Sequence, residues 1–413
     1  MSAPLSTDVL IIGAGPAGLT AAASLAPHLA GEVLVLEREA EAGGIPRHSD
    51  HPGYGIRDLK TFVSGPAYAR RLTARALKAG ARVQTQAMVT GWAGARTVEV
   101  TSPAGRQRIA ARAIVLATGA RERPRAARLV PGDRPAGVYT TGQLQNLVHL
   151  QHARPGHRAV IVGAELVSWS AAVTLRAAHC QPVLMTSAYD KPESYAAFTV
   201  PGRLALRLPV ATRTRIARII GEGRVRAVEL EHLDTGARRT VECDTVVFTG
   251  DWIPDNELAR AVGLEMDPHT RGPLVDTAQV TSDPGVFAIG NLTHPVDTAD
   301  VAALDGRAVA SHVLRYLSEG ASAGSTETRV VPGENLLWIS PGRINNSAAP
   351  PRGRLLSWPR RHVSVPTVTV RQDGTTLVSR RIPWPASPGR VFRIPSSLLD
   401  SAPDGATVTV DIA

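Results

Sequence analysis

Cysteine is scarce in this chain of 413 residues, and its scarcity removes several kinds of redox and metal site. The two cysteines, Cys180 and Cys243, lie far apart and form no C-x-x-C motif. A disulfide framework, an iron–sulfur cluster held by this chain and a cysteine zinc site each need more thiols or closer spacing. All three are therefore excluded, and we expect no metal site.

Aromatic residues make up only 4% of the chain, and lysine is nearly absent. The formal net charge is +10, yet only three of the 46 basic residues are lysines. Proteins that bind single-stranded nucleic acid combine positive charge with aromatic stacking platforms. We interpret the basicity as biased arginine usage and expect no nucleic-acid partner.

Long apolar runs are missing as well. The best candidate for a membrane span, residues 159–178, contains Glu165 and Arg176. The first residues lack the charged and apolar regions of a secretory signal. With 43% hydrophobic and 20% charged residues, the composition is that of a soluble globular protein of two to three domains. We expect a cytoplasmic protein without a membrane span.

The stretch over residues 8–22 reads DVLIIGAGPAGLTAA and contains a G-x-G-x-x-G motif. The apolar run before Gly13 is typical of a buried parallel strand, and an apolar helical run follows Gly18. The glycines allow a tight turn, close approach of a pyrophosphate and close helix–strand packing. A second strand over 33–36 ends in Glu37, where an acid accepts hydrogen bonds from a ribose. This context predicts a dinucleotide site in the first fifty residues.

Three later segments add to this site. A long polar loop over residues 41–59 carries paired glycines and two histidines, and loops of that length usually carry function. A strand over 107–116 ends in Ala-Thr-Gly, small residues that let the chain cross close beneath a bound dinucleotide. A strand over 286–289 precedes a helix from about 300 to 317, whose N-terminus can stabilise negative charge on a ligand.

A second β-α-β unit begins at Ala159, but only Gly163 of its three motif glycines is present. Glu165 and Ser168 occupy the other two positions, and the following strand leads to Ser187 rather than to an acid. Two like charges about 4 Å apart repel by roughly 4 kcal/mol at an effective dielectric near 20. We therefore predict that the fold of this unit is kept and that its phosphate loop is damaged.

Beyond Ser318 the composition changes. EGASAGSTET, residues 319–328, is predicted to be a flexible linker. Residues 329–413 are rich in proline and in period-2 stretches, and Asp373-Gly374 is a hairpin turn signal. This pattern predicts a small all-β module for packing against a partner or for stabilising the rest of the chain.

Together these motifs resemble the two-dinucleotide-binding-domain FAD oxidoreductases. GGIPRHSDHPGYG (43–55) and TFVSGPAYARRL (61–72) are similar to the FAD-binding α-type subunits of heteromeric dye-linked dehydrogenases, such as opine oxidase, hydrogen cyanide synthase and glycerol-3-phosphate dehydrogenase-like proteins. The resemblance implies an α/β fold, an FAD-binding Rossmann-like domain with an inserted NAD(P)-like Rossmann domain, plus a small C-terminal all-β domain. The implied boundaries are 1–125 and 256–318 for the FAD domain, 126–255 for the inserted domain and 329–413 for a β-sandwich-like domain.

The chain departs from that family at two motif positions. Ser49 stands where relatives usually carry a cysteine, and Asn291 stands where an aspartate commonly contacts the ribityl-phosphate region of FAD. An amide can still make the latter bonds. The missing C-x-x-C excludes the dithiol mechanism of the disulfide-reductase branch, and a Cys-rich iron–sulfur module is also missing.

The resemblance implies an FAD-dependent oxidoreductase, the electron-transfer subunit of a heteromeric dehydrogenase that oxidises a small amine, amino acid or hydroxy compound. Its expected partners are a second flavoprotein subunit and a small iron–sulfur or accessory subunit. The alternatives are a stand-alone NAD(P)H-dependent flavin oxidoreductase and a non-catalytic scaffold that holds FAD or another nucleotide.

FAD is the expected cofactor, and NAD(P) is doubtful because of Glu165 and Ser168. His48 and His51 are the candidate catalytic residues, as proton donors or orienting groups, with a loop-stabilising role as the alternative. The residues expected to contact FAD are Gly13, Gly15, Pro16, Ala17, Gly18, Glu37, Arg38, Gly43, Gly44, Arg47, Met88, Val89, Ala117, Thr118, Gly119, Gly290, Asn291 and Val301.

Overall fold

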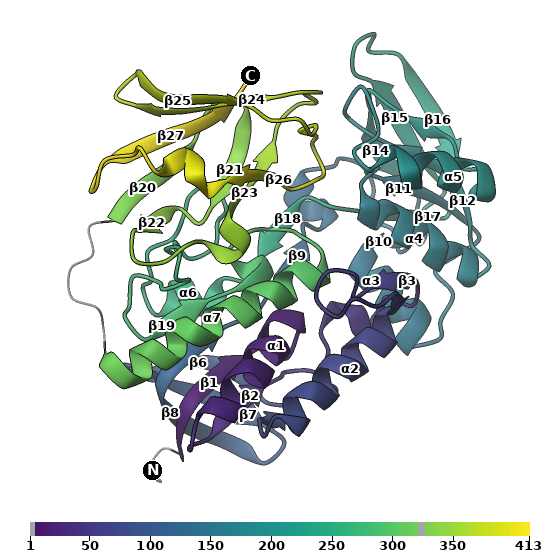
Figure 1. Ribbon diagram of the computed structural model, residues 1–413. Helices are drawn as coiled ribbons and strands as arrows, with labels where there is room; N and C mark the ends of the chain where they lie inside the picture. The colour runs from purple at the N-terminus through teal and green to yellow at the C-terminus, as the bar shows by residue number, and fades with distance from the viewer. Residues whose placement is uncertain (1–4, 321–326) are drawn as a thin grey trace.

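The computed structural model describes residues 5–320 and 327–413, which form two α/β domains and a β-rich C-terminal module (Figure 1). The linker predicted over 319–328 falls largely on residues 321–326, outside the described residues. We refer to residues 327–413 as the C-terminal module.

The first domain is built on a sheet in the order β5-β2-β1-β8-β7-β6, with β19 pairing with β8. The strands β5, β2, β1, β8 and β19 run parallel, whereas β7 and β6 continue the sheet in antiparallel fashion. The bounds are β1 Leu5–Ile12, β2 Val33–Leu36, β5 Arg82–Gln84, β6 Met88–Gly94, β7 Thr97–Ser102, β8 Gly105–Leu116 and β19 Val286–Ala288. Because β19 comes from much later in the chain, this sheet is completed only after the second domain has been inserted.

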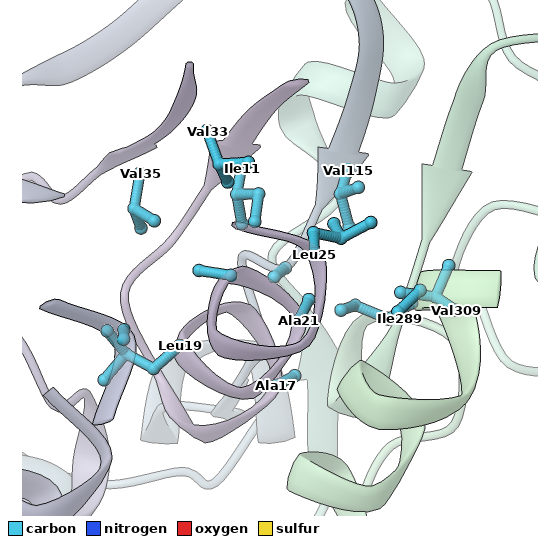
Figure 2. Close-up of a cluster of buried hydrophobic side chains, with 14 of the residues drawn as sticks. Ile11, Ala17, Leu19, Ala21, Leu25, Val33, Val35, Val115, Ile289 and Val309 are labelled. Atoms are coloured by element: carbon cyan, nitrogen blue, oxygen red, sulfur yellow. The ribbon is translucent and has the colours of Figure 1, made fainter. Parts of the chain in front are cut away.

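Three helices pack on one face of the first sheet: α1 (Pro16–Leu25), α2 (Gly65–Lys78) and α7 (Ala299–Glu319). The α1 sequence is rich in alanine, which allows close approach of a neighbouring helix. A Cβ at Gly306 of α7 would overlap the carbonyl oxygen of Ala17, so the two helices are in direct backbone contact there. Figure 2 shows Ile11, Val115, Ile289 and other side chains filling the space between α1, the sheet and α7.

The second domain has a parallel sheet in the order β10-β17-β11-β12-β13. Its strands are β10 Val138–Thr140, β11 Arg158–Val162, β12 Gln181–Thr186, β13 Val210–Ala211 and β17 Thr245–Phe248, and its helices are α3 Thr141–Gln145, α4 Leu166–Ala177 and α5 Ala196–Leu206. An antiparallel sheet packs beside it, made of β14 Thr214–Ile220, β15 Ala227–His232 and β16 Arg238–Glu242. The antiparallel pair β9 (Ala120–Glu122) and β18 (Trp252–Pro254) forms the crossing between the two domains.

The C-terminal module contains a five-stranded sheet in the order β22-β20-β27-β24-β25 and a three-stranded sheet β21-β23-β26. Their bounds are β20 Glu327–Pro332, β21 Leu336–Ser340, β22 Arg343–Asn345, β23 Arg354–Pro359, β24 Thr367–Gln372, β25 Thr375–Arg381, β26 Phe392–Pro395 and β27 Thr407–Ile412. Asp373 (φ 48°) and Gly374 (φ 82°) join β24 to β25 with the two positive φ angles of a type I′ turn. The predicted hairpin is therefore confirmed.

Three short elements complete the described chain: β3 (Pro52–Tyr54), β4 (Val63–Ser64) and α6 (Glu257–Ala261). Strands β3 and β4 pair within the long loop that follows Glu37. None of the helices in residues 5–320 and 327–413 is long and apolar enough to cross a membrane.

The predicted fold class is confirmed: two Rossmann-like units, the second inserted into the first, are followed by an all-β module. The predicted strand over 33–36 is β2, and the predicted helix from about 300 to 317 is α7. Helix α2 begins at Gly65, and Pro66 is tolerated because it lies in the first helical turn.

Candidate functional site

The first glycine loop, Gly13–Gly18, leaves an open space at the N-terminus of α1. A Cβ on Gly13 would overlap the carbonyl oxygen of Ala117, and one on Gly18 would overlap that of Gly13. At Gly15, by contrast, no described atom lies within 4 Å of the position that a Cβ would take. No side chain caps α1, whose first turn contains Pro16. The loop therefore fits a dinucleotide pyrophosphate, which would accept hydrogen bonds from the helix N-terminus.

Glu37 lies at the end of β2 and is held toward this loop. Its Oε2 accepts a hydrogen bond from the Ala14 backbone N–H (3.0 Å), and its Oε1 accepts one from the Glu39 N–H (2.9 Å). The carboxylate is buried, and its orientation suits a ribose hydroxyl next to the loop. The Ala87 N–H bonds to the Glu37 carbonyl, which brings β6 alongside. The first residues of β6 thus lie beside the predicted ribose position, with Met88 exposed and Val89 buried.

The paired glycines after Glu37 pack on the first loop. The Gly43 N–H donates to the Ala14 carbonyl (2.8 Å), and a Cβ on Gly44 would lie 2.9 Å from the Gly15 Cα. Both glycines have positive φ, 130° and 62°. Close approach and backbone conformation therefore both require glycine here.

Arg38 and Arg47, the two arginines expected to contact FAD, lie farther from the first glycine loop. Arg47 donates to the Glu41 carbonyl (3.1 Å) and pairs with Glu39 at 3.8 Å. Arg38 is exposed and pairs with Asp255 at 3.5 Å. The structure therefore places both against protein groups, Arg38 at the surface.

The strand end at Ala117–Gly119 passes beneath Gly13, as the small residues predict. The Ala117 N–H donates to the Ile12 carbonyl (2.9 Å), and the Thr118 hydroxyl donates to the Asp255 carbonyl (2.7 Å). Gly119 has a φ of 77° at the turn into β9. This segment positions the first loop and also begins the crossing to the second domain.

Gly290 and Asn291, which follow strand β19, lie on the other side of the site. A Cβ on Gly290 would lie 2.9 Å from the Ala17 Cβ, so this turn packs directly on α1. The Asn291 side chain donates to the Asp297 carbonyl (3.2 Å) and accepts from the Asp297 N–H (3.1 Å). Val301 is buried in the first turn of α7. Asn291 thus closes the loop that leads into α7, a role that the sequence does not indicate.

The two histidines of the long loop differ in surroundings. His48 is buried, and burial together with the positive charges of Arg47 and His149 lowers its pKa to about 4. His48 is therefore neutral at pH 7. Its Nδ1 has no hydrogen-bond partner among the described residues.

His51 belongs to a hydrogen-bond network that joins the two domains. Its Nδ1 lies 2.9 Å from the Pro52 carbonyl and donates to it, so its Nε2 accepts, 2.7 Å from the Ser170 Oγ and 3.0 Å from the Ser49 Oγ. The Gln145 side chain donates to both serine oxygens, at 2.7 and 3.3 Å. Gln145 lies on α3 and Ser170 on α4, more than ninety residues from the loop, and no sequence signal links them to it.

The second loop, Gly163–Ser168, has the same framework with a filled helix N-terminus. Glu165 is the N-cap residue of α4: its carbonyl oxygen accepts a hydrogen bond from the Ser168 N–H (3.1 Å), and the Ser168 Oγ accepts one from the Glu165 N–H (3.0 Å). The two residues that replace the motif glycines are thus hydrogen-bonded to each other at the start of α4. The Glu165 carboxyl group lies against Gly250, where a Cβ would overlap its Oε1, so a side chain is present at the position that is open at Gly15.

Burial, with Glu193 and Glu122 nearby, raises the pKa of Glu165 to about 8. The carboxyl group is therefore mostly protonated at pH 7. The charge repulsion expected from the sequence is correspondingly weak, and the obstruction is mainly the presence of the side chain itself.

The C-terminal module covers this filled loop. A Cβ on Gly389 would overlap the Glu193 Cβ and lie 2.9 Å from the Glu165 Cγ. The Ser387 Oγ donates to the Glu193 carbonyl at 3.5 Å, and the Arg390 guanidinium lies 4.2 Å above the Tyr195 ring. In an open parallel sheet, a ligand binds outside the carboxyl ends of the strands. Here that position carries a segment of the same chain.

The same module is tied to the first domain by buried ion pairs. Arg352 pairs with Asp305 of α7 at 2.6 Å, and Arg393 pairs with Asp297 at 2.6 Å. Burial opposes ionisation of Asp305, but the charges and hydrogen bonds of His294 and Arg352 hold its pKa below the usual range. The C-terminal module therefore contacts both nucleotide-binding domains.

Both cysteines are buried and unpaired. Burial raises the pKa of Cys180 to about 12 and that of Cys243 to about 11, so neither forms a reactive thiolate near neutral pH. Within residues 5–320 and 327–413, no group of three or more His, Cys, Asp or Glu side chains is arranged to hold a metal ion.

The sequence profile of the pyridine nucleotide-disulphide oxidoreductase family matches residues 7–306, so the C-terminal module lies outside the match. The ferredoxin–NAD(+) reductase component of the biphenyl dioxygenase system of Paraburkholderia xenovorans is 31% identical over 313 residues, covering 69% of this chain and 67% of that protein. An opine oxidase subunit from Agrobacterium tumefaciens is 26% identical over 360 residues, covering 78% and 69%. The thioredoxin reductase structure from T. acidophilum superimposes with a TM-score of 0.63 at 23% identity, covering 75% of this chain and 97% of that one.

Proposed function

The chain belongs to the pyridine nucleotide-disulphide oxidoreductase family and is an FAD-dependent oxidoreductase, and within that family we propose that it is the FAD-binding, electron-transferring subunit of a heteromeric dehydrogenase. The complex would oxidise a small amine, amino acid or hydroxy compound. A second flavoprotein subunit would supply the site of substrate oxidation, with a small iron–sulfur or accessory subunit as a further member.

The residues of the first site fit FAD. The α1 N-terminus at Gly15 would hold the pyrophosphate, Glu37 the adenosine ribose, and the α7 N-terminus near Val301 the flavin end. When bound, FAD supplies the acceptance and release of electrons, while the protein supplies position and electrostatics. His48, neutral and buried in the same loop, can hold or pass a proton beside the cofactor.

The observation that carries the proposal is the filled second loop. Members of a family named for pyridine nucleotides need a nucleotide site, and here the α4 N-terminus is capped by Glu165 and covered by Gly389. This arrangement favours electrons arriving from a partner subunit instead of from NADH or NADPH. The histidines give little support for substrate activation, because His51 is engaged at the domain interface.

The name of the opine oxidase relative, which marks that protein as one subunit of an oxidase, supports the same assignment. A second candidate function comes from the ferredoxin–NAD(+) reductase relative. A stand-alone NAD(P)H-dependent reductase would need the second loop to open. The two candidates make opposite predictions about reduction by pyridine nucleotides.

Stopped-flow mixing with NADH or NADPH separates them. We expect no rapid bleaching of the bound flavin at micromolar nucleotide, and full bleaching by a strong chemical reductant followed by re-oxidation with a quinone-like dye. Rapid bleaching by either nucleotide would favour the reductase. Failure of the dye to re-oxidise the flavin would favour a non-catalytic scaffold.

Co-expression tests the subunit role. The chain is produced alone and together with the products of its neighbouring genes, and amino-acid, opine and polyol oxidation is assayed with an artificial acceptor. We expect turnover only in the co-expressed complex. Strong turnover by the chain alone would contradict the proposal.

A further inference from the structure

Helix α5, Ala196–Leu206, turns apolar side chains toward solvent. Thr199 is its buried residue, and Gly202 packs so closely on α4 that a Cβ there would lie 2.7 Å from the Trp169 ring. At 100° per residue, one set of side chains lies opposite this contact. We call this set the α5 patch: Ala197, Val200, Pro201 and Leu204.

The α5 patch is exposed to an unusual degree. Leu204 is 75% exposed and Val200 is 56% exposed, on a helix whose inward face is also largely uncharged. A helix that is apolar on all sides is normally covered. The described part of the chain provides nothing that covers this face.

Positive charge flanks the α5 patch without any compensating acid. Arg176 of α4, together with Arg203 and Arg207 at the end of α5, makes no ion pair within the described residues. Neither Leu166–Ala177 nor Ala196–Leu206 contains an acidic residue. A surface that is apolar in the middle and basic at its edge complements an anionic apolar boundary.

A small cavity lies at the C-terminal ends of α4 and α5, beyond Leu204, and none of the α5 patch residues lines it. Its volume is about 380 Å³, and it is lined by Arg176, Gln181, Ala205, Leu206 and Arg207. The C-terminal ends of α4 and α5 each contribute a partial charge of about −0.5, which two guanidinium groups exceed. The cavity can therefore accept a phosphate group next to the apolar surface.

We propose that the α5 patch docks on an anionic membrane surface, with the aliphatic side chains at the headgroup–acyl boundary and a lipid phosphate in the Arg176–Arg207 cavity. Apolar residues flanked by arginines suit the boundary between anionic headgroups and acyl chains. Tyr195 and Phe198, with ring centroids 6.4 Å apart and both exposed, extend the surface with aromatic rings that suit the same boundary. The net charge of +10 adds long-range attraction.

Two other occupants fit the surface less well. A second copy in a two-fold contact would place the same arginines opposite one another without acids. A protein partner would normally form about one hydrogen bond per 100–200 Å² of interface, whereas the centre of the α5 patch offers no side-chain hydrogen-bonding group. Acyl chains need none. This proposal does not depend on the proposed subunit role.

Vesicle co-sedimentation tests the proposal on the full FAD-loaded chain. Vesicles of phosphatidylcholine with 30 mol% phosphatidylglycerol are compared with vesicles of phosphatidylcholine alone, at low and at physiological salt. We expect at least ~10-fold stronger partitioning to the anionic vesicles, decreasing with salt. Equal partitioning to both vesicle types, or none, would overturn the proposal.

Matched variants separate the patch from general basicity. Val200→Asp and Leu204→Asp should each weaken partitioning by about tenfold or more, whereas Leu5→Asp should not, although Leu5 is 55% exposed, almost as much as Val200. Leu5 begins β1, which starts on the other side of the molecule from α5 (Figure 1). Replacing Arg176, Arg203 and Arg207 by Gln should remove the preference for anionic vesicles.

Flavin content serves as the folding check, because α5 does not belong to the first domain. Wild-type partitioning in Leu204→Asp would overturn the proposal. So would a dimer, or a stable complex with a co-expressed protein, that forms in the wild type and is lost in Leu204→Asp. Those outcomes would assign the surface to a second copy or to a protein partner.

Discussion

The first and second glycine loops occupy equivalent strand–loop–helix units but differ in the space left at the helix N-terminus. At Gly15 the helix N-terminus is open, whereas at Glu165 the chain caps its own helix and the C-terminal module lies over it. The apolar centres of the strands before both loops are buried, with Ile11 and Ile161 inaccessible to solvent. Strand burial thus maintains the fold in both units, while the space at the helix N-terminus depends on two or three small residues and can change separately.

The largest effect is expected when a side chain is placed in the open first loop. Gly15→Leu should reduce FAD affinity at least ~100-fold, about 2.8 kcal/mol, because its side chain enters the space for the pyrophosphate. The ratio of flavin to protein absorbance after purification measures this. Gly223→Leu, also at a position with no atom within 4 Å, is the matched control and should stay yellow. Full flavin occupancy in Gly15→Leu would contradict the loop assignment.

Breaking the ion pair between the C-terminal module and α7 has the next largest expected effect, a loss of stability. Arg352→Gln leaves the buried Asp305 with only His294, and should lower the free energy of unfolding by about 2 kcal/mol, less than for a fully buried pair because Arg352 is 24% exposed. Arg329→Gln breaks an exposed pair with Glu265 and should cost under about 0.5 kcal/mol. Denaturant unfolding measures both. Equal costs for the two variants would contradict the burial argument.

The titration of Glu165 sharpens the comparison, since the first loop has no ionisable residue. Burial and the neighbouring Glu193 and Glu122 raise its pKa from 4.5 to about 8, so the folded state holds a proton that the unfolded state releases. Its contribution to stability is complete below about pH 4.5 and is lost as the pH rises to about 8, by up to about 1.4 kcal/mol per pH unit. Glu165→Gln keeps the cap and removes this dependence. Urea unfolding at pH 5.5 and 7.5 should show a steeper loss in the wild type, and identical slopes would refute the assignment.

The smallest expected change in stability concerns the hydrogen-bond network of His51, Ser170 and Gln145, which joins the two nucleotide-binding domains. Ser170→Ala removes the hydroxyl that contacts His51 and Gln145, and should lower the free energy of unfolding by about 1 kcal/mol. Ser102→Ala removes an exposed hydroxyl and should have almost no effect. Thermal melting of both variants provides the measurement. A loss in Ser102→Ala equal to that in Ser170→Ala would mean that the network adds nothing.

The features predicted well from the sequence are local ones. Gly13, Gly15 and Gly18 are separated by a few residues, and the strand and helix around them follow from short apolar runs. The turn at Asp373–Gly374 is likewise specified by two adjacent residues. In each case the physical requirement and the residues that meet it lie in one stretch of chain.

The features that the sequence did not indicate depend on distant contacts. Ser170 meets His51 across 119 positions, and Arg393 meets Asp297 across 96. Glu165 stands out in the sequence as the residue predicted to impair the second loop, but its raised pKa comes from burial and from Glu193 and Glu122, whose proximity no local pattern shows. The cover formed by Gly389 depends on how a separate module docks.

The placement of β19 beside β8 has a consequence for the order of events on the ribosome. The strand that completes the first sheet, Val286–Ala288, and the helix that packs on α1, Ala299–Glu319, are synthesised after the entire second domain. Domains generally fold as units while the chain is made. The inserted domain can therefore fold while the first domain still lacks its last strand, and the first glycine loop acquires its neighbour α7 only after the second domain has been synthesised.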